Sequence, residues 1–84
     1  MMSGLEGVMK EKLELKLAID AFAYEMQRKM CKCAEEGKRG WRDFPRALTR
    51  MEEELDEYHQ SGDPAELVDA ANFLLMEWFR KVKP

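Results

Sequence analysis

Apolar residues recur at steps of three and four in the first part of the chain, which is the spacing of one helix face. They are Ile19, Phe22, Met26, Met30 and Cys33. Three leucines further upstream, Leu13, Leu15 and Leu17, make that part apolar on more than one side. The pattern predicts one helix from about Met9 to Glu36, which at ~1.5 Å per residue exceeds the width of a small domain. Its N-terminal half is expected either to lie against a second subunit or to be frayed.

A second amphipathic segment begins near Asp43, a good N-cap, and runs to about Tyr58, with Phe44 and Pro45 at its start. Its apolar stripe consists of Ala47, Leu48, Met51, Leu55 and Tyr58. On a helical wheel Glu53, Glu54 and Glu57 border this stripe instead of opposing it. An ordinary solvated face would lie on the far side.

A third helix follows Gly62, with Asp63 as N-cap and Pro64 in the first helical position. Glu66 stands three residues after the cap, so it can be a capping-box residue only. Asp69 and Asn72 are poor helix formers in the middle of the segment, which indicates a role beyond propensity. No strand signal is present. The prediction is an all-α fold with three main helices in a single domain, 1–84, whose first eight residues, 1–8, are disordered.

A short cationic loop, 37–41, separates the first two helices. Gly37 can cap the first helix and Gly40 allows a turn. Lys38 and Arg39 can meet phosphates, or they can complement the carbonyl end of the helix. Trp41 is either a core anchor or a stacking surface for a base. Without further information, the preferred interpretation is that Lys38 and Arg39 complement the helix end and that Trp41 packs in the core.

The amino-acid composition and net charge argue against some classes of function. The 84 residues are 45% apolar and 37% charged, with a formal net charge of −3. That balance is typical of a helical globular protein, and it argues against binding to a nucleic acid polymer. No apolar run approaches the ~20 residues of a membrane helix, and the N-terminus lacks the apolar core of a signal peptide. We therefore expect a cytoplasmic protein that does not bind membranes, and whose small core favours oligomerisation.

The cysteines and the histidine of this chain do not have the spacing of a zinc site, a redox motif or a catalytic triad. Cys31 and Cys33 are two residues apart and point away from each other on a helix, and His59 is the only histidine. Zinc knuckles and redox motifs use the C-x-x-C spacing instead. We expect two reduced thiols, and a catalytic triad is not credible.

Acidic pairs spaced by three residues are the main candidate chemistry. Glu54 with Glu57, and Glu66 with Asp69, each share a helix face. Two such helices packed antiparallel could direct four carboxylates into one space, where they would need a cation. All-oxygen ligands favour magnesium or manganese over zinc, and magnesium often shares a substrate phosphate. The alternative is plain solvation of two acidic helices.

The ordered motifs of the chain resemble a known family. They are Phe22-Ala23-x-x-Met26, Lys38-Arg39-Gly40-Trp41, Glu53-Glu54-x-x-Glu57, and the run from Glu66-Leu67-Val68-Asp69 through Ala70-Ala71-Asn72-Phe73 to Met76. From about Ala21 to Trp78 the chain is similar to short, single-domain MazG-like, all-α nucleoside triphosphate pyrophosphohydrolases. In one respect it departs from them: only the segment from Tyr58 to Ala65 separates the two acidic motifs, where many relatives have a longer connection.

The resemblance implies hydrolysis of a nucleoside triphosphate to the monophosphate and pyrophosphate, with magnesium as cofactor. It implies an obligate homodimer or homotetramer, which would complete a four-helix-type core. Carried onto this chain, the metal ligands would be Glu54, Glu57, Glu66 and Asp69. Glu53 would be a further ligand or position the water, and Lys38 and Asn72 would contact phosphates or ligands. Trp41 is a candidate surface for the base, since choosing among nucleotides needs an apolar or aromatic wall.

Two functional hypotheses remain at this point. The first is a magnesium-dependent hydrolase that keeps nucleotide pools clean. The second is a helical homo-oligomer that binds nucleotide or a protein partner without chemistry, which the short connection and the capping role open to Glu66 favour.

Overall fold

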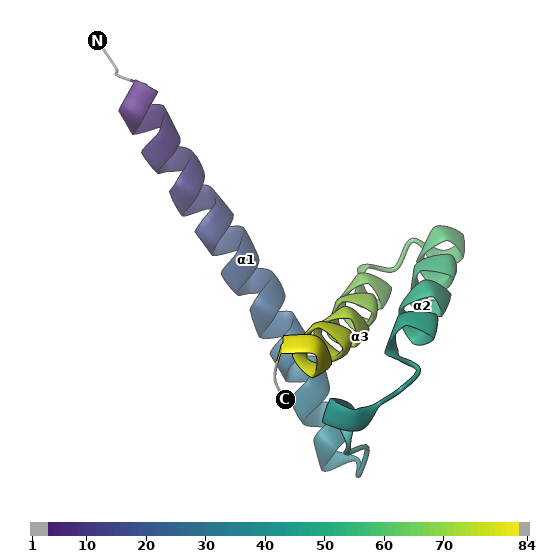
Figure 1. The fold of residues 1–84 in the computed structure, drawn as a ribbon. Helices are drawn as coiled ribbons and strands as arrows, with labels where there is room; N and C mark the ends of the chain where they lie inside the picture. The colour runs from purple at the N-terminus through teal and green to yellow at the C-terminus, as the bar shows by residue number, and fades with distance from the viewer. Residues whose placement is uncertain (1–3, 83–84) are drawn as a thin grey trace.

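The protein is a long helix joined to a helical hairpin in the computed structural model, which describes residues 4–82. Its elements are α1 (Gly4–Glu35), the 3-10 helix η1 (Trp41–Asp43), α2 (Ala47–Ser61) and α3 (Pro64–Val82). Residues 4–82 contain no strand, which confirms the predicted all-α class with three main helices. Figure 1 shows α2 and α3 as an antiparallel pair; α3 crosses the C-terminal half of α1, and the N-terminal half extends away. None of the helices described is long and apolar enough to cross a membrane.

Helix α1 begins earlier than the apolar pattern predicts. It starts at Gly4 instead of near Met9, so the predicted start is wrong and residues 4–8, expected to be disordered, are helical here; residues 1–3 lie outside the described chain. The segment holds no proline, and Glu6 lies in the first turn, where a carboxylate favours the helix dipole.

Gly37 ends α1 in the way the sequence predicts. Its φ of +88° is left-handed, and its N–H donates to the Ala34 carbonyl at 3.0 Å. The N–H of Lys38 reaches the Cys33 carbonyl at 2.9 Å. These two bonds form a Schellman motif, which satisfies carbonyls that would otherwise be unpaired at the helix end.

Helix α2 begins later than predicted, at Ala47 and not near Asp43. Asp43 belongs to η1, where its N–H bonds the Gly40 carbonyl at 3.2 Å. Phe44 then has extended backbone, with φ −74° and ψ 109°. The physical reason is Pro45, because the ring of a proline disfavours helical backbone in the residue before it. The role of Asp43 as cap of α2 is therefore wrong; the cap position is Arg46.

Helix α3 starts at Pro64 with Asp63 as its cap, as predicted. Asp63 Oδ1 accepts the Ala65 N–H at 2.9 Å. The capping box is closed through an extra hydroxyl: the Asp63 N–H donates to Ser61 Oγ at 3.0 Å, and Ser61 Oγ donates to Glu66 Oε2 at 2.9 Å. Glu66 therefore has a structural partner at the turn, as its capping alternative allows.

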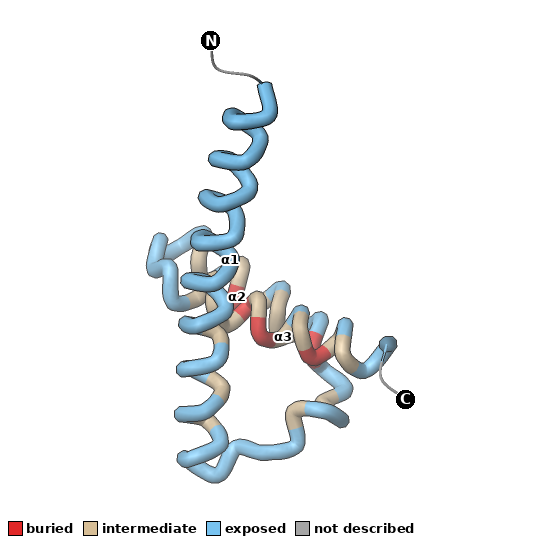
Figure 2. Tube along the Cα trace, turned by 90° about the vertical axis from the view of Figure 1, so that its left-hand side faces the viewer, coloured by how far each residue is buried: buried red, intermediate tan, exposed pale blue. Residues whose placement is uncertain are grey.

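Within residues 4–82 the buried residues all lie on α2 and α3. They are Ala47, Glu54, Ala70, Asn72 and Met76. Figure 2 shows this red and tan core along the hairpin, while the N-terminal half of α1 is exposed throughout. Two of the five buried side chains, Glu54 and Asn72, are polar, which is unusual for so small a core and directs attention to the space around them.

Candidate functional site

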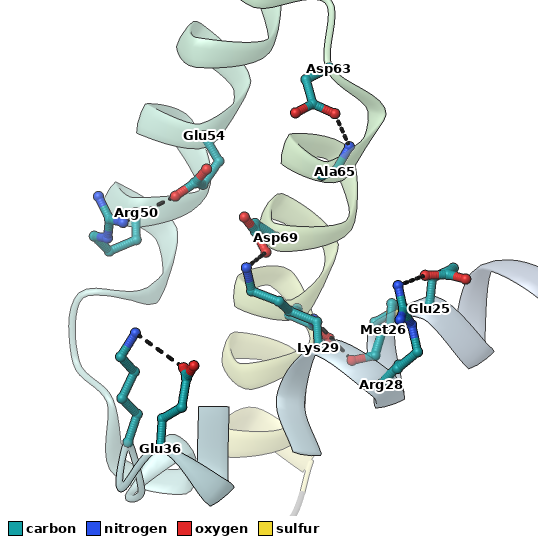
Figure 3. A network of polar contacts seen from close by, with 12 residues as sticks. Glu25, Met26, Arg28, Lys29, Glu36, Arg50, Glu54, Asp63, Ala65 and Asp69 are labelled. Atoms are coloured by element: carbon teal, nitrogen blue, oxygen red, sulfur yellow. Dashed lines mark hydrogen bonds and ion pairs between the residues drawn. The ribbon is translucent and has the colours of Figure 1, made fainter. Parts of the chain in front are cut away.

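Glu54 and Asp69 face each other across the hairpin, from the middle of α2 and the first half of α3 (Figure 3). Glu54 is only 6% exposed. Burial raises the pKa of Glu54, and the negative charges of Glu57 and then of Asp69 raise it further. A hydrogen bond with Glu57 acts in the same direction. The two acidic motifs are therefore close enough for Glu54, Glu57 and Asp69 to influence one another, as the sequence predicts.

Arg50 is the counterion of the acidic side of α2. Its Nη2 lies 3.0 Å from Glu54 Oε1, and this positive charge opposes the rise in the Glu54 pKa. Its Nη1 donates to Glu53 Oε2, and this hydrogen bond raises the pKa of Arg50. Glu53 also lies 3.7 Å from Nη2 of Arg46. The predicted water-positioning residue, Glu53, is thus held by Arg50 of its own helix and by Arg46 at the cap position.

Lys29 of α1 neutralises the acidic side of α3. Its Nζ lies 3.3 Å from Asp69 Oδ1, so the ion pair joins the long helix to the hairpin (Figure 3). The sequence motifs did not point to Lys29. The available signal was its place next to Met30 on the apolar stripe, where a lysine stem can pack while its ammonium group reaches a site.

A cavity of about 440 Å³ lies against these groups. It is lined by Lys29, Met30, Cys33, Lys38, Arg39, Gly40, Trp41, Phe44, Arg50, Glu54, Asp69, Asn72, Phe73 and Met76. Five predicted site residues are thus gathered around one space: Glu54, Asp69, Lys38, Trp41 and Asn72. A second cavity, of about 730 Å³, shares part of this lining and continues along α1 past Met26 and Ala34.

Three predicted site residues do not line either cavity. Glu53 is held by Arg50, Glu66 accepts from Ser61, and Glu57 is exposed beside Glu54. Only Glu57 has an electrostatic link to the facing carboxylates. The pair on α3 therefore divides: Asp69 faces the cavity, whereas Glu66 stabilises the turn.

Trp41 packs on α3 with one side and borders the cavities with another. Its ring packs edge-to-face on Phe79 of α3, with centroids 4.9 Å apart and planes at 65°. The Arg42 guanidinium lies 5.5 Å from the same ring. The Phe44 ring packs separately, with its centroid 5.8 Å from that of Phe73. Trp41 also borders both cavities and remains half-exposed, so it is anchored on one side and open on another.

Lys38 is an exposed cation of the cavity lining. Its Nζ lies 3.8 Å from Glu36 Oε1, and its side chain is 74% exposed. A loose surface pair of this kind contributes little to stability, so Lys38 is free to turn toward an anion at little cost. Together with Arg39, Lys29 and Arg50 it gives the cavity four positive side chains.

The side chains of this site include the oxygen ligands that magnesium prefers, but they are not arranged to bind an ion. Glu54, Glu57 and Asp69 supply carboxylate oxygens, which magnesium prefers. Within the residues described, however, no three His, Cys, Asp or Glu side chains are arranged to hold one ion. Glu54 and Asp69 are each engaged by a cationic side chain. A bound cation would have to displace Lys29 and Arg50, and Glu66 would have to leave Ser61 to join it.

Comparison with known protein families, with curated proteins and with solved structures finds no match to this chain. Function is therefore inferred from the cavity and from the sequence motifs.

Proposed function

We propose that this protein is a magnesium-dependent nucleoside triphosphate pyrophosphohydrolase, which cleaves a ribo- or deoxyribonucleotide to its monophosphate and pyrophosphate and helps to clean the nucleotide pool. One observation carries the proposal. A single cavity has carboxylates on one side, four cationic side chains around it and an aromatic ring, and these are the groups that a metal, a polyphosphate and a base require. The resemblance to MazG-like hydrolases supports the same reading.

Each group has a proposed task. Glu54, Glu57 and Asp69 would hold magnesium (or manganese), with Glu66 as a fourth donor once released from Ser61. The bound ion supplies positive charge and a more acidic water. Lys38 and Arg39 lie on the loop that lines the cavity, where their charges would bind the triphosphate and favour the charge that develops during cleavage. Glu53 lies outside the cavity in the single chain, so positioning the attacking water, its proposed task, would require it to leave Arg50 and Arg46.

The exposed apolar residues of α1 support a homodimer or homotetramer. Met9, Leu13 and Leu17 follow one another at steps of four on one face of α1, and they are between 57% and 60% exposed in the single chain. Apolar side chains in such a row are stabilised when they are covered, and a second α1 would cover them and complete a four-helix-type core. We propose a cytoplasmic enzyme acting on free nucleotides, with neither a membrane nor a nucleic acid polymer as partner.

Asp69→Asn tests the hydrolase. The amide keeps the size of the side chain but loses the charge that pairs with Lys29 and would bind the metal. We expect pyrophosphate release, measured with magnesium over a panel of canonical and damaged triphosphates, to fall at least about a hundredfold. The matched control is Asp56→Asn, at an exposed position of α2, which should keep the parent rate.

Turnover of the Asp69→Asn variant at the parent rate would remove Asp69 from the chemistry. Absence of pyrophosphate release by the parent over the whole panel would reject the hydrolase altogether.

The second candidate is a binding module without chemistry. The observation in its favour is that Lys29 and Arg50 already neutralise the carboxylates, so the fold does not require a cation. Magnesium titration separates the two, because a ligand that binds only the native state stabilises it by about 2.7 kcal/mol at a hundredfold excess over its Kd. A rise in melting temperature with magnesium favours the hydrolase; an unchanged one, with no pyrophosphate released, favours the module.

A further inference from the structure

Asn72 carries a buried hydrogen-bond acceptor whose partner is missing. The side chain is 3% exposed, and its Nδ2 donates to the main-chain carbonyl of Met26 on α1 at 3.2 Å. Within residues 4–82 its Oδ1 has no hydrogen-bond partner. Buried polar groups are nearly always paired, so an orphan of this kind indicates a donor that the chain alone does not supply.

The bond to Met26 fixes which end of the amide is left over. A main-chain carbonyl can only accept, so the NH₂ group must face α1 and the oxygen must lie on the other side. The unpaired group is therefore an acceptor, and its partner must be a donor. A phosphate oxygen is an acceptor too, which argues against the phosphate contact that the resemblance implies for Asn72.

The surroundings of Asn72 suit a flat apolar ring. Asn72 borders both cavities, and so do Trp41 and Met30. Phe73 and Met76 add apolar surface to the smaller cavity. Such a wall of aromatic and thioether groups with one polar atom binds heteroaromatic rings, since the apolar part stacks and the polar atom orients.

We propose that Asn72 and Trp41 form a base subsite, in which the cavity wall opens far enough for Asn72 Oδ1, which is closed off from solvent in the unliganded chain, to accept a hydrogen bond from the amino group of cytosine or adenine. This assignment rests on the proposed function only in taking the ligand to be a nucleotide, whose phosphates would reach Lys38 and Arg39 next to Trp41 in sequence. Uracil and hypoxanthine carry a carbonyl oxygen at the same ring position. Two acceptors would then face each other, so the subsite selects against these bases.

Equilibrium binding of monophosphates in the presence of a metal chelator tests the subsite without any hydrolysis. Trp78→Phe, which replaces an exposed residue of α3, leaves Trp41 as the single tryptophan. Binding is then followed by quenching of its fluorescence and by calorimetry. We expect deoxycytidine monophosphate to bind about tenfold more tightly than deoxyuridine monophosphate, and deoxyadenosine monophosphate about tenfold more tightly than deoxyinosine monophosphate.

Asn72→Leu, in the same Trp78→Phe background, removes the acceptor while keeping a side chain of similar volume, and it should abolish both preferences. Equal affinities of the parent for each pair, or no binding of any of the four, would overturn the proposal. The parent measurement decides even where Asn72→Leu fails to fold. An enzyme that releases pyrophosphate without base preference refutes the subsite alone, whereas base selection without pyrophosphate release refutes the hydrolase alone.

Discussion

The N-terminal half of α1 and the α2–α3 hairpin use their apolar residues in opposite ways. Every residue from 4 to 25 is exposed, although this stretch contains several large apolar side chains. Those that are exposed include Leu5, Val8, Leu13, Leu15, Leu17, Ile19 and Phe22. The hairpin, in contrast, contains all five buried residues of the described chain. Apolar content alone therefore does not tell which part of this chain is packed.

The comparison also shows where the hairpin core gives up stability. Glu54 and Asn72 occupy two of the five buried positions, and each leaves a polar group under-compensated, by a raised pKa or by an unpaired oxygen. Such groups lower the stability of the hairpin. Covering the exposed apolar face of α1 in an oligomer would offset that loss. In the oligomer proposed above, association would stabilise a chain whose own core holds polar groups.

The largest effect is expected from charging the exposed face of α1. Leu13→Glu combined with Leu17→Glu places two carboxylates one helical turn apart on that face. Each leucine that is covered by a partner contributes about 1.5–3 kcal/mol, so two should weaken self-association at least about a hundredfold. Sedimentation over a range of protein concentrations measures the change.

The matched control is Lys12→Gln combined with Lys16→Gln, which has the same spacing and changes the net charge by the same amount. It should leave the oligomer intact. A parent protein that sediments as a folded monomer at micromolar concentration would contradict both the oligomer and the account of stability given for the hairpin.

Local signals predicted the fold where the deciding groups are neighbours in sequence. Gly37 ends α1 and Asp63 caps α3 because each acts on backbone groups within a few residues. The start of α2 was wrong because a cap residue at Asp43 was given more weight than Pro45, whose ring keeps Phe44 extended and so out of the helix; the further shift of the start to Ala47 does not follow from Pro45. The restriction on Phe44 was also available in the sequence.

The candidate site was predicted only in part, because some of its members meet through tertiary packing. Helical spacing and the motifs predicted Glu54, Asp69, Lys38, Trp41 and Asn72 as site residues, and all five line one cavity. Lys29 was missed since its ion pair with Asp69 depends on where α1 crosses α3, which no local pattern encodes. The place of Glu66 at the turn depends on Ser61, whose hydroxyl lies outside the usual capping box.

Two glycine-to-alanine substitutions compare the backbone at the end of α1 with that of its exposed N-terminal half. At both Gly37 and Gly7 an added Cβ would meet nothing within 4 Å, so the backbone alone decides the outcome. Gly37→Ala places a side chain at φ +88° and should destabilise the protein by about 1–2 kcal/mol in urea unfolding. Gly7→Ala should favour the helix locally by up to about 1 kcal/mol.

The Gly7→Ala variant also reports whether the exposed half of α1 belongs to the cooperative fold. Helicity measured by circular dichroism should rise while the midpoint of hairpin unfolding, followed by tryptophan fluorescence, stays unchanged in a monomeric background such as the double glutamate variant. A matching rise in the midpoint there would show that the two regions unfold as one unit.

Glu54→Gln addresses the polar part of the hairpin core through pH. Burial and the charges of Glu57 and Asp69 raise the Glu54 pKa above its ordinary value of 4.5, against the opposing charge of Arg50. A carboxyl with a raised folded-state pKa contributes its full stability below the unfolded pKa and loses it as pH rises through the folded value. The free energy of unfolding of the parent, minus that of the Glu54→Gln variant, should therefore fall between pH 4 and pH 8. Urea unfolding at matched protein concentration measures this difference, in which the other titrating groups cancel, and Glu52→Gln at an exposed position of α2 controls for the lost charge. A difference that grows with pH would mean that the ion pair with Arg50 outweighs the effect of burial. The ionised Glu54 carboxylate would then stabilise the fold, and it would not need a bound cation to compensate its charge.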